Sequence, residues 1–210
     1  MSIQNNKYVI NLDVDGGDNA PSSVLNGAEL YLKDNQNVRF NLYGRKSIID
    51  FHIKNLPLLL NFSNIIDCEG VIDGNLKPTE AMKKEFRHSS LAKSISSLKN
   101  QPLEATVSSG NTGAMMAYSK VFLRTVENIS RPAIASLFPS KNHPVCFLDL
   151  GANSECDENN LYDFAIMGTI YYQILFPKST CKVSLLNIGS EELKGNTIIQ
   201  KTHELLKKSK

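Results

Sequence analysis

Short apolar runs that alternate with longer helical patterns are the feature that most constrains the fold of this chain. Several runs are rich in Val, Ile and Leu without polar alternation, as in strands that are buried on both faces. This alternation is typical of βαβ units on a mostly parallel sheet, and so of the α/β class. The expected strands are residues 8–14, 38–44, 63–68, 105–109, 133–138, 145–150 and 182–188, and the expected helices are residues 21–34, 46–55, 79–99, 112–127, 159–175 and 193–208.

Length and composition favour one α/β domain over residues 1–210. The chain has 41% hydrophobic and 21% charged residues, which suits a globular protein with a sizeable core. It contains no repeat of fixed period and no low-complexity linker. The helix expected at 159–175 is apolar beyond one stripe, because Ile170 and Ile174 lie outside the stripe of Leu161 and Phe164. Such a helix packs inside the core or against a second subunit, and we expect core packing.

Charge and targeting signals point to a cytoplasmic protein without a nucleic-acid partner. The 23 basic residues nearly balance the 21 acidic ones, and the lysines of the last ten residues suit a solvated helix end. The first ten residues are too polar for a signal peptide, and no apolar run has membrane-spanning length. The four cysteines show no Cys-x-x-Cys spacing and the four histidines are scattered, so we expect buried thiols and no metal site.

Four expected strands end in polar, glycine-bearing turns that open helices, at residues 13–21, 108–114, 149–160 and 187–196. The carboxyl ends of parallel strands share one edge of a sheet, where ligands bind. Glycine permits a close approach of the backbone, and helix N-termini offer unpaired N–H groups that suit an anion. Each turn alone also fits a plain βα connection, but together they predict one anion site. The G-x-G-x-x-G and P-loop motifs are absent, so no dinucleotide or ATP cofactor is expected.

A lysine at the head of the last expected helix opposes the helix dipole, whereas the nearby Glu191 and Glu192 suit it. This residue, Lys194, is either a ligand for a substrate phosphate or an exposed, solvated lysine, and the residue pattern leaves both readings open.

The ordered set of motifs resembles the PlsX family, the acyl-ACP:phosphate acyltransferases of bacterial phospholipid synthesis. The motifs are DVDGGDNAP, SSGNTGAMMA, RPAIASLFP, LDLGAN, FAIMG and LLNIGSEELKGN, and they extend from about residue 8 to 208. The resemblance implies a three-layer α/β/α fold akin to the isocitrate and isopropylmalate dehydrogenases, and a homodimer. It also implies that inorganic phosphate attacks the thioester of a long-chain acyl carrier protein, without a cofactor, to give acyl phosphate.

The family motifs imply roles for individual residues. Lys194 is the main charge on the phosphate or the developing oxyanion, and Asn111 and Thr112 add hydrogen-bond donors. Asp13 and Asp18 orient the loops rather than transfer protons. The implied phosphate- and substrate-binding residues are Gly16, Gly17, Asp18, Ser109, Gly110, Thr112, Gly113, Asp149, Asn153, Glu192, Gly195 and Asn196.

Two departures from the family affect these expectations. Val14 and Asp15 replace an Ala-Met pair, and a carboxylate near a bound phosphate is unfavourable unless it points away. The family also continues beyond the position of Lys210, with another loop of the cleft and a helical hairpin at the membrane and dimer interface. We therefore expect peripheral contact with the inner face of the membrane through that part, and little or no activity for residues 1–210 alone. The alternatives are a phosphotransacetylase-like enzyme that uses acetyl-CoA, and a non-catalytic remnant that binds carrier protein.

Overall fold

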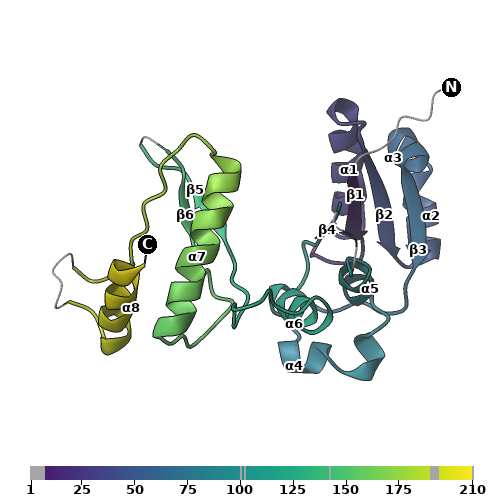
Figure 1. Cartoon of the computed structure of the whole chain (residues 1–210). Coiled ribbons are helices and arrows are strands. Elements are labelled where there is room, and N and C mark those ends of the chain that lie inside the picture. The colour runs from purple at the N-terminus through teal and green to yellow at the C-terminus, as the bar shows by residue number, and fades with distance from the viewer. Residues whose placement is uncertain (1–7, 100, 102, 142, 190–193, 210) are drawn as a thin grey trace. The chain divides into compact units, whose positions relative to one another are not determined.

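The computed structural model of the chain describes residues 8–99, 101, 103–141, 143–189 and 194–209 (Figure 1). Internal contacts divide the chain into two compact units, Met1–Arg124 and Thr125–Lys210, and each is described here by itself. The expectation that residues 1–210 form a single domain stays a prediction.

The first unit contains a four-stranded parallel sheet in the order β3-β2-β1-β4. Its strands are β1 (Tyr8–Asp13), β2 (Val38–Gly44), β3 (Ser63–Asp67) and β4 (Glu104–Val107). The first four expected strands are thereby confirmed, as is their parallel pairing. The register places the last residues of β1 and β4 side by side, with Leu12 opposite Val107.

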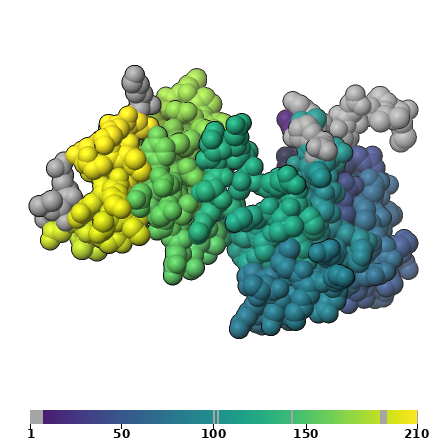
Figure 2. Space-filling model, turned by 60° about the horizontal axis from the view of Figure 1, so that its bottom comes forward, coloured from purple at the N-terminus to yellow at the C-terminus, as the bar shows by residue number. Residues whose placement is uncertain are grey.

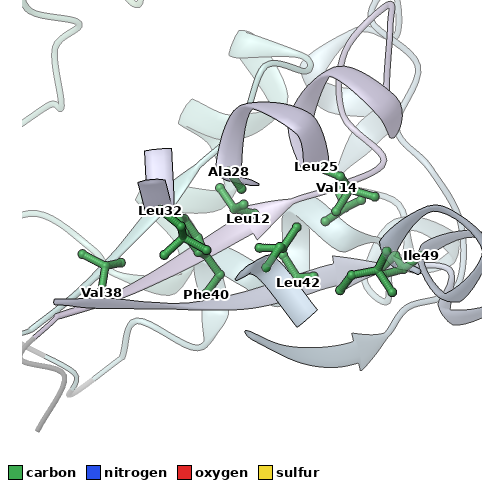
Figure 3. Close-up of a cluster of buried hydrophobic side chains, with 11 residues drawn as sticks. Leu12, Val14, Leu25, Ala28, Leu32, Val38, Phe40, Leu42 and Ile49 are labelled. Carbon is green, nitrogen blue, oxygen red and sulfur yellow. The ribbon is translucent and has the colours of Figure 1, made fainter. Parts of the chain in front are cut away.

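One face of this sheet is apolar and is covered by α1 (Ser22–Asp34), α2 (Lys46–Ile53) and α3 (Pro57–Phe62). Leu12 and Val14 enter this core (Figure 3). Because side chains alternate along β1, Asn11 and Asp13 point to the other face, where they contact Ser97 and Ser90. The helix α3 was not expected. The buried cluster consists of Leu12, Val14, Leu25, Ala28, Leu32, Val38, Phe40, Leu42, Ile49, Ile53 and Leu59.

The opposite face of the sheet is polar and lies against α5 (Ser90–Ser96). Asn11 is fully buried there, and its amide nitrogen donates to Ser97 Oγ at 3.0 Å and to Glu104 Oε2 at 2.9 Å. Its amide oxygen accepts from Asn41 at 2.8 Å. Helices therefore flank both faces of the sheet, as the predicted α/β class requires.

The single helix expected over residues 79–99 is wrong. The segment forms α4 (Pro78–Ala81), a 3₁₀ helix η1 (Lys84–Phe86) and α5. The backbone is extended at Lys83 and again at Ser89, whose hydroxyl accepts from Ala92 N and so begins α5. These short helices pack with α6 (Thr112–Phe122), which ends before the expected residue 127, around the buried Tyr118.

The second unit contains β5 (Ser136–Phe138), β6 (Val145–Phe147), α7 (Glu158–Leu175) and α8 (Thr197–Lys208). The strands expected at 133–138 and 145–150 are shorter than predicted and form a separate antiparallel pair, so the expectation that they belong to the mostly parallel sheet is wrong. Only residues 139–144 connect these two strands, whereas parallel neighbours need a crossover of a dozen or more residues. The strand expected at 182–188 is also wrong, because these described residues pair with no other strand.

The long helix α7 starts and ends close to the expected limits, with a capping box between Asp157 and Asn160. The expectation of full core burial is wrong for this chain, because Phe164 is buried whereas Ile170 is 53% and Ile174 is 69% exposed. The alternative, burial against a second subunit, stays a prediction. Among the described residues, no helix combines the length and apolar character that crossing a bilayer requires.

Candidate functional site

The loops after β1 and β4 lie next to each other because these two strands are neighbours in the sheet. From β1 the chain continues through α1 on the apolar face, whereas from β4 it enters α6, which packs against α5 on the other side. This divergence makes the position between β1 and β4 a topological switch point, the place at which open α/β sheets bind ligands. We call Gly16–Asp18 and Ser109–Gly113 the cradle.

Three glycines of the cradle, Gly16, Gly17 and Gly110, lie where an added side chain would be crowded or strained. A Cβ at Gly16 would lie 2.2 Å from Asp13 Oδ2, and one at Gly110 would lie 3.1 Å from Gly16 Cα. Gly17 adopts a φ of +112°, which only glycine adopts readily. Ser109 Oγ donates to the carbonyl of Gly16 at 2.7 Å and so links the two loops.

A buried carboxylate beneath the cradle joins three segments. The carboxylate of Asp13 accepts from Ser90 Oγ at 2.5 Å and from Ser108 Oγ at 2.6 Å, and Ser108 Oγ accepts in turn from Gly110 N at 3.0 Å. Burial raises the pKa of Asp13, and the two serine hydrogen bonds oppose that rise. These contacts support a role for Asp13 in orienting the loops.

The head of α6 provides N–H groups without an internal partner. Asn111 is the N-cap residue, and its Oδ1 accepts from Ala114 N at 2.8 Å. Thr112 and Gly113 form the first turn, and their backbone N–H groups have no hydrogen-bond partner among the described residues. This end of α6 can therefore receive an anion.

The side-chain amide of Asn111 is already occupied. Its Nδ2 lies 3.0 Å from Asp73 O, 3.1 Å from Gly74 O and 2.8 Å from Leu76 O. These contacts fasten the turn before α4 to the head of α6. The amide therefore has no N–H left for a substrate in this arrangement, and its visible role is to position the loop.

Asp15 points away from the cradle, which resolves the charge conflict that the sequence raises. Its buried carboxylate accepts from Arg45 N at 3.0 Å and from Arg45 Nε and Nη2 at 3.3 Å each. Asp67 accepts from Lys46 N at 2.8 Å. Two protein carboxylates thus satisfy the head of α2, in contrast to the open head of α6.

Two of the predicted residues of the second unit, Asp149 and Asn153, organise the third loop. Asp149 accepts from Ile134 N at 2.8 Å, from Ala152 N at 3.2 Å and from both nitrogens of Asn153 at 2.8 and 3.0 Å. Burial alone would raise the pKa of Asp149, but these hydrogen bonds outweigh burial and lower it. Both side chains therefore shape the loop from within.

The fourth loop precedes α8, as predicted, but α8 begins at Thr197 rather than at residue 193, so the expectation that Lys194 lies at the head of the helix is wrong. Asn196 caps this helix through Ile199 N at 2.9 Å, and Gly195 adopts a φ of +90°. Lys194 is exposed, and its carbonyl accepts from Asn187 Nδ2 at 3.0 Å. The predicted residue Glu192 lies outside the described residues.

The structure brings the predicted residues together in two groups. The first and second loops meet in the cradle of the first unit. In the second unit, Asn196 of the fourth loop lines a pocket with Ser154–Asp157 and Asn160 of the third loop. The convergence of all four loops on one site stays a prediction, because the two groups belong to different units.

Sequence reasoning missed Ser90, Ser108 and the turn held by Asn111. The parallel register could have indicated Ser108, because Leu12 opposite Val107 puts Asp13 opposite Ser108 on the polar face. Nothing in the sequence links Ser90 to Asp13, which lies 77 residues away in the chain.

All four cysteines are free, and they differ in burial. Cys68 is buried, which raises the pKa of its thiol to about 11, whereas Cys146, Cys156 and Cys181 are half-buried, so the expectation of burial is confirmed only for Cys68. Within the described part of the chain, no three His, Cys, Asp or Glu side chains group in a way that could hold a metal ion.

Comparison with known proteins identifies similar sequences. Residues 8–210 match the family described as "Fatty acid synthesis protein". A phosphate acyltransferase of Pelagibacter ubique is 40% identical over 197 aligned residues, which cover 94% of this chain and 58% of that protein. One of Wolbachia pipientis is 41% identical, with 99% and 61% covered, and one of Caldicellulosiruptor saccharolyticus is 36% identical, with 96% and 60% covered. The chain thus spans about 60% of the length of these curated relatives.

Proposed function

This chain belongs to the fatty acid synthesis protein family of the phosphate acyltransferases, the PlsX family, and from that premise we propose its reaction. It transfers a long-chain acyl group from acyl carrier protein to inorganic phosphate and so gives acyl phosphate for phospholipid synthesis. The chain spans about 60% of the length of its relatives, so this proposal concerns a protein of the relatives' full length.

The observation that carries the proposal is the cradle at the switch point between β1 and β4. Two glycine-bearing loops meet there, so that a Cβ at Gly110 would lie 3.1 Å from Gly16 Cα. The N–H groups of Thr112 and Gly113 face no internal acceptor among the described residues. Unpaired N–H groups at the positive end of a helix suit a small dianion. The neighbouring head of α2 is filled by Asp15 and Asp67, so α6 is the better phosphate site.

In the proposed reaction, an oxygen of the hydrogen phosphate dianion attacks the carbonyl carbon of the thioester. A C–O bond forms, the carbonyl becomes an oxyanion, and the C–S bond then breaks to release the carrier thiolate. The phosphate's proton ends on that thiolate, so acyl phosphate and the free carrier thiol result. Phosphate is already an anionic nucleophile at neutral pH, so no Ser-His-Asp triad is required. Orientation of two bound reactants can lower the barrier by roughly 7–11 kcal/mol.

The structure refines the roles proposed for individual residues. Thr112 and Gly113 offer backbone donors to the phosphate, whereas Asn111 positions the loop because its own amide is occupied. Lys194 is exposed and carries the charge proposed for the phosphate or the oxyanion. The proposed binding or loop-forming roles are kept for the other predicted glycines and for Asp18, Ser109, Asn153, Asn196 and Glu192.

The proposal also includes the three-layer fold, the homodimer and the cellular location that the family implies. The sheet flanked by helices supports the three-layer, dehydrogenase-like arrangement. The exposed apolar residues of α7, including Ile170 and Ile174, support burial against a second subunit in a homodimer. A cytoplasmic location with peripheral membrane contact follows from the family and belongs to the longer protein.

The proposed function is tested by phosphate-dependent loss of a long-chain acyl-carrier thioester. The assay compares residues 1–210 with a version extended to the length of the relatives, and we expect turnover in the extended version. Its Lys194→Ala variant should lose about 100-fold in turnover, the range of a lost charge-stabilising donor, while Lys182→Ala, another exposed lysine of the second unit, should change little.

Each other outcome contradicts a named part of the proposal. Near-normal turnover of Lys194→Ala removes that lysine from the mechanism. A preference for acetyl-CoA identifies a phosphotransacetylase-like enzyme instead. Carrier binding without phosphate-dependent thioester loss in the extended version identifies a non-catalytic protein.

A further inference from the structure

The segment between β3 and α5 concentrates positive charge that the site described above does not use. Residues 77–87 carry four basic residues, Lys77, Lys83, Lys84 and Arg87, against Glu80 and Glu85. The whole chain has 23 basic and 21 acidic residues. This short segment alone therefore has the same excess of basic over acidic residues as the entire chain. We call these four basic residues the basic strip.

The cations of the basic strip are exposed and available to a partner. No carboxylate among the described residues forms an ion pair with any of them. Elsewhere, exposed lysines do have carboxylate partners, as in Lys46 with Asp50 at 3.0 Å and Lys201 with Glu158 at 3.2 Å. An unpaired group of cations can therefore meet carboxylates of another molecule without breaking internal pairs.

The basic strip is fastened directly to the cradle. Asn111 Nδ2 donates to Leu76 O at 2.8 Å, immediately before Lys77, and a Cβ at Gly113 would lie 2.6 Å from Pro78 Cγ. Farther along, the hydroxyl of the buried Tyr118 donates to Ala81 O at 2.5 Å. Figure 1 shows α4, α5 and α6 together at the end of the first unit, and Figure 2 turns this end of the unit toward the viewer.

We propose that the basic strip is the docking surface for the acidic acyl carrier protein, which delivers the acyl thioester to the adjacent cradle. This inference rests on the proposed function for the identity of the partner. The cations are distributed over 11 residues: Lys84 lies in η1, and the other three lie at the caps of α4 and η1. This spread suits several carboxylates of a protein surface better than one phosphate.

The surroundings of the basic strip argue against other anionic partners. None of the large hydrophobic side chains that are exposed in the described structure lies between Leu60 and Leu103, so the segment that carries the basic strip offers no such side chain for insertion into a membrane. The nearly balanced charge of the chain and the two interleaved glutamates do not suit a nucleic acid.

The test measures binding of acyl carrier protein directly, independently of turnover. Fluorescence anisotropy with labelled carrier protein compares the wild-type chain with Lys83→Ala/Lys84→Ala and with the charge-reversed Lys83→Glu/Lys84→Glu. Lys33→Ala/Lys54→Ala is the matched control, because these exposed lysines lie at the C-terminal ends of α1 and α2. These helices run antiparallel to the strands, so both lysines lie toward the edge of the sheet opposite the cradle.

We expect the alanine pair to weaken binding about fivefold to tenfold, the reversed pair to weaken it further, and the control to leave it unchanged. Binding to the wild type should also weaken as ionic strength rises. The proposal is overturned if the wild-type chain does not bind carrier protein, if the variants bind as the wild type does, or if the control weakens binding equally. Wild-type binding that depends on the strip but is not followed by thioester loss in the extended version would contradict the proposed reaction and leave this docking surface standing.

Discussion

At the scale of single residues, the site depends on side chains that hold loops rather than on side chains with exposed reactive groups. Asp13 is buried beneath the cradle and accepts from Ser90 and Ser108. Asn111 uses its oxygen to cap α6 and its nitrogen to hold the turn at Leu76. The groups left for a substrate are therefore backbone N–H groups, which keep their direction only if the loops are fixed.

Gly16→Ala should destabilise the first unit, because the added Cβ would lie 2.2 Å from Asp13 Oδ2, and Asp13 cannot move without breaking its serine contacts. We expect a loss of about 1–3 kcal/mol in the free energy of unfolding, measured by urea denaturation.

The matched control for this change is Gly27→Ala, since a Cβ at Gly27 of α1 meets nothing within 4 Å. This variant should be stabilised by roughly 0.5–1 kcal/mol through helix propensity. Equal unfolding midpoints for Gly16→Ala and the wild type would show that the loops are not as closely packed as described.

At the scale of helices and strands, the sequence indicated the elements that have strong local signals. The strands β1 to β4 were recognisable from their apolar runs, and α7 from its periodicity and its polar start at Asp157. The break between α4 and α5 was not recognisable, because residues 79–99 contain no glycine or proline that would signal the extended backbone at Lys83.

The candidate site, like the helices and strands, was predictable only in part. Parallel topology was enough to bring the loops of Gly16 and Gly110 together. The contact between Asn111 and the turn at Asp73 was not predictable, because the two segments are 38 residues apart and neither carries a signal for the other. Hydrophobicity also misled the strand prediction at 182–188, whose Leu186 is 84% exposed in this chain.

One hydrogen bond should account for much of the attachment of α4 to α6. Tyr118 is fully buried, stacks on Phe122 at 5.4 Å between ring centroids, and donates to Ala81 O. Tyr118→Phe keeps the ring but leaves the carbonyl of Ala81 without this donor. We expect it to lower the free energy of unfolding by about 1–2 kcal/mol in guanidinium titrations.

Tyr31→Phe is the control for that change, because Tyr31 is 44% exposed. Removal of its hydroxyl should change stability by less than about 0.5 kcal/mol. If both variants unfold at the same denaturant concentration, the bond to Ala81 does not hold α4 in place.

At the scale of the whole molecule, the residues to which we assign functions lie in two separate units. The cradle and the basic strip beside it belong to the first unit, and Lys194, Asn196 and the loop of Asp149 belong to the second; that both groups serve one site is part of the proposed function. The chain spans about 60% of the length of its relatives. Anion binding at the cradle needs only the first unit, which makes it the part of the account that this chain can test alone.

The most direct test is a titration of the ¹⁵N-labelled chain with inorganic phosphate, followed by amide chemical shifts in NMR spectra. We predict saturable shifts of the amides of Gly17, Thr112 and Gly113, and no comparable shifts at Arg45 and Lys46, whose N–H groups are bound to Asp15 and Asp67. Saturable shifts confined to other parts of the chain, or no saturable shift at all, would contradict the claim that the cradle holds the phosphate.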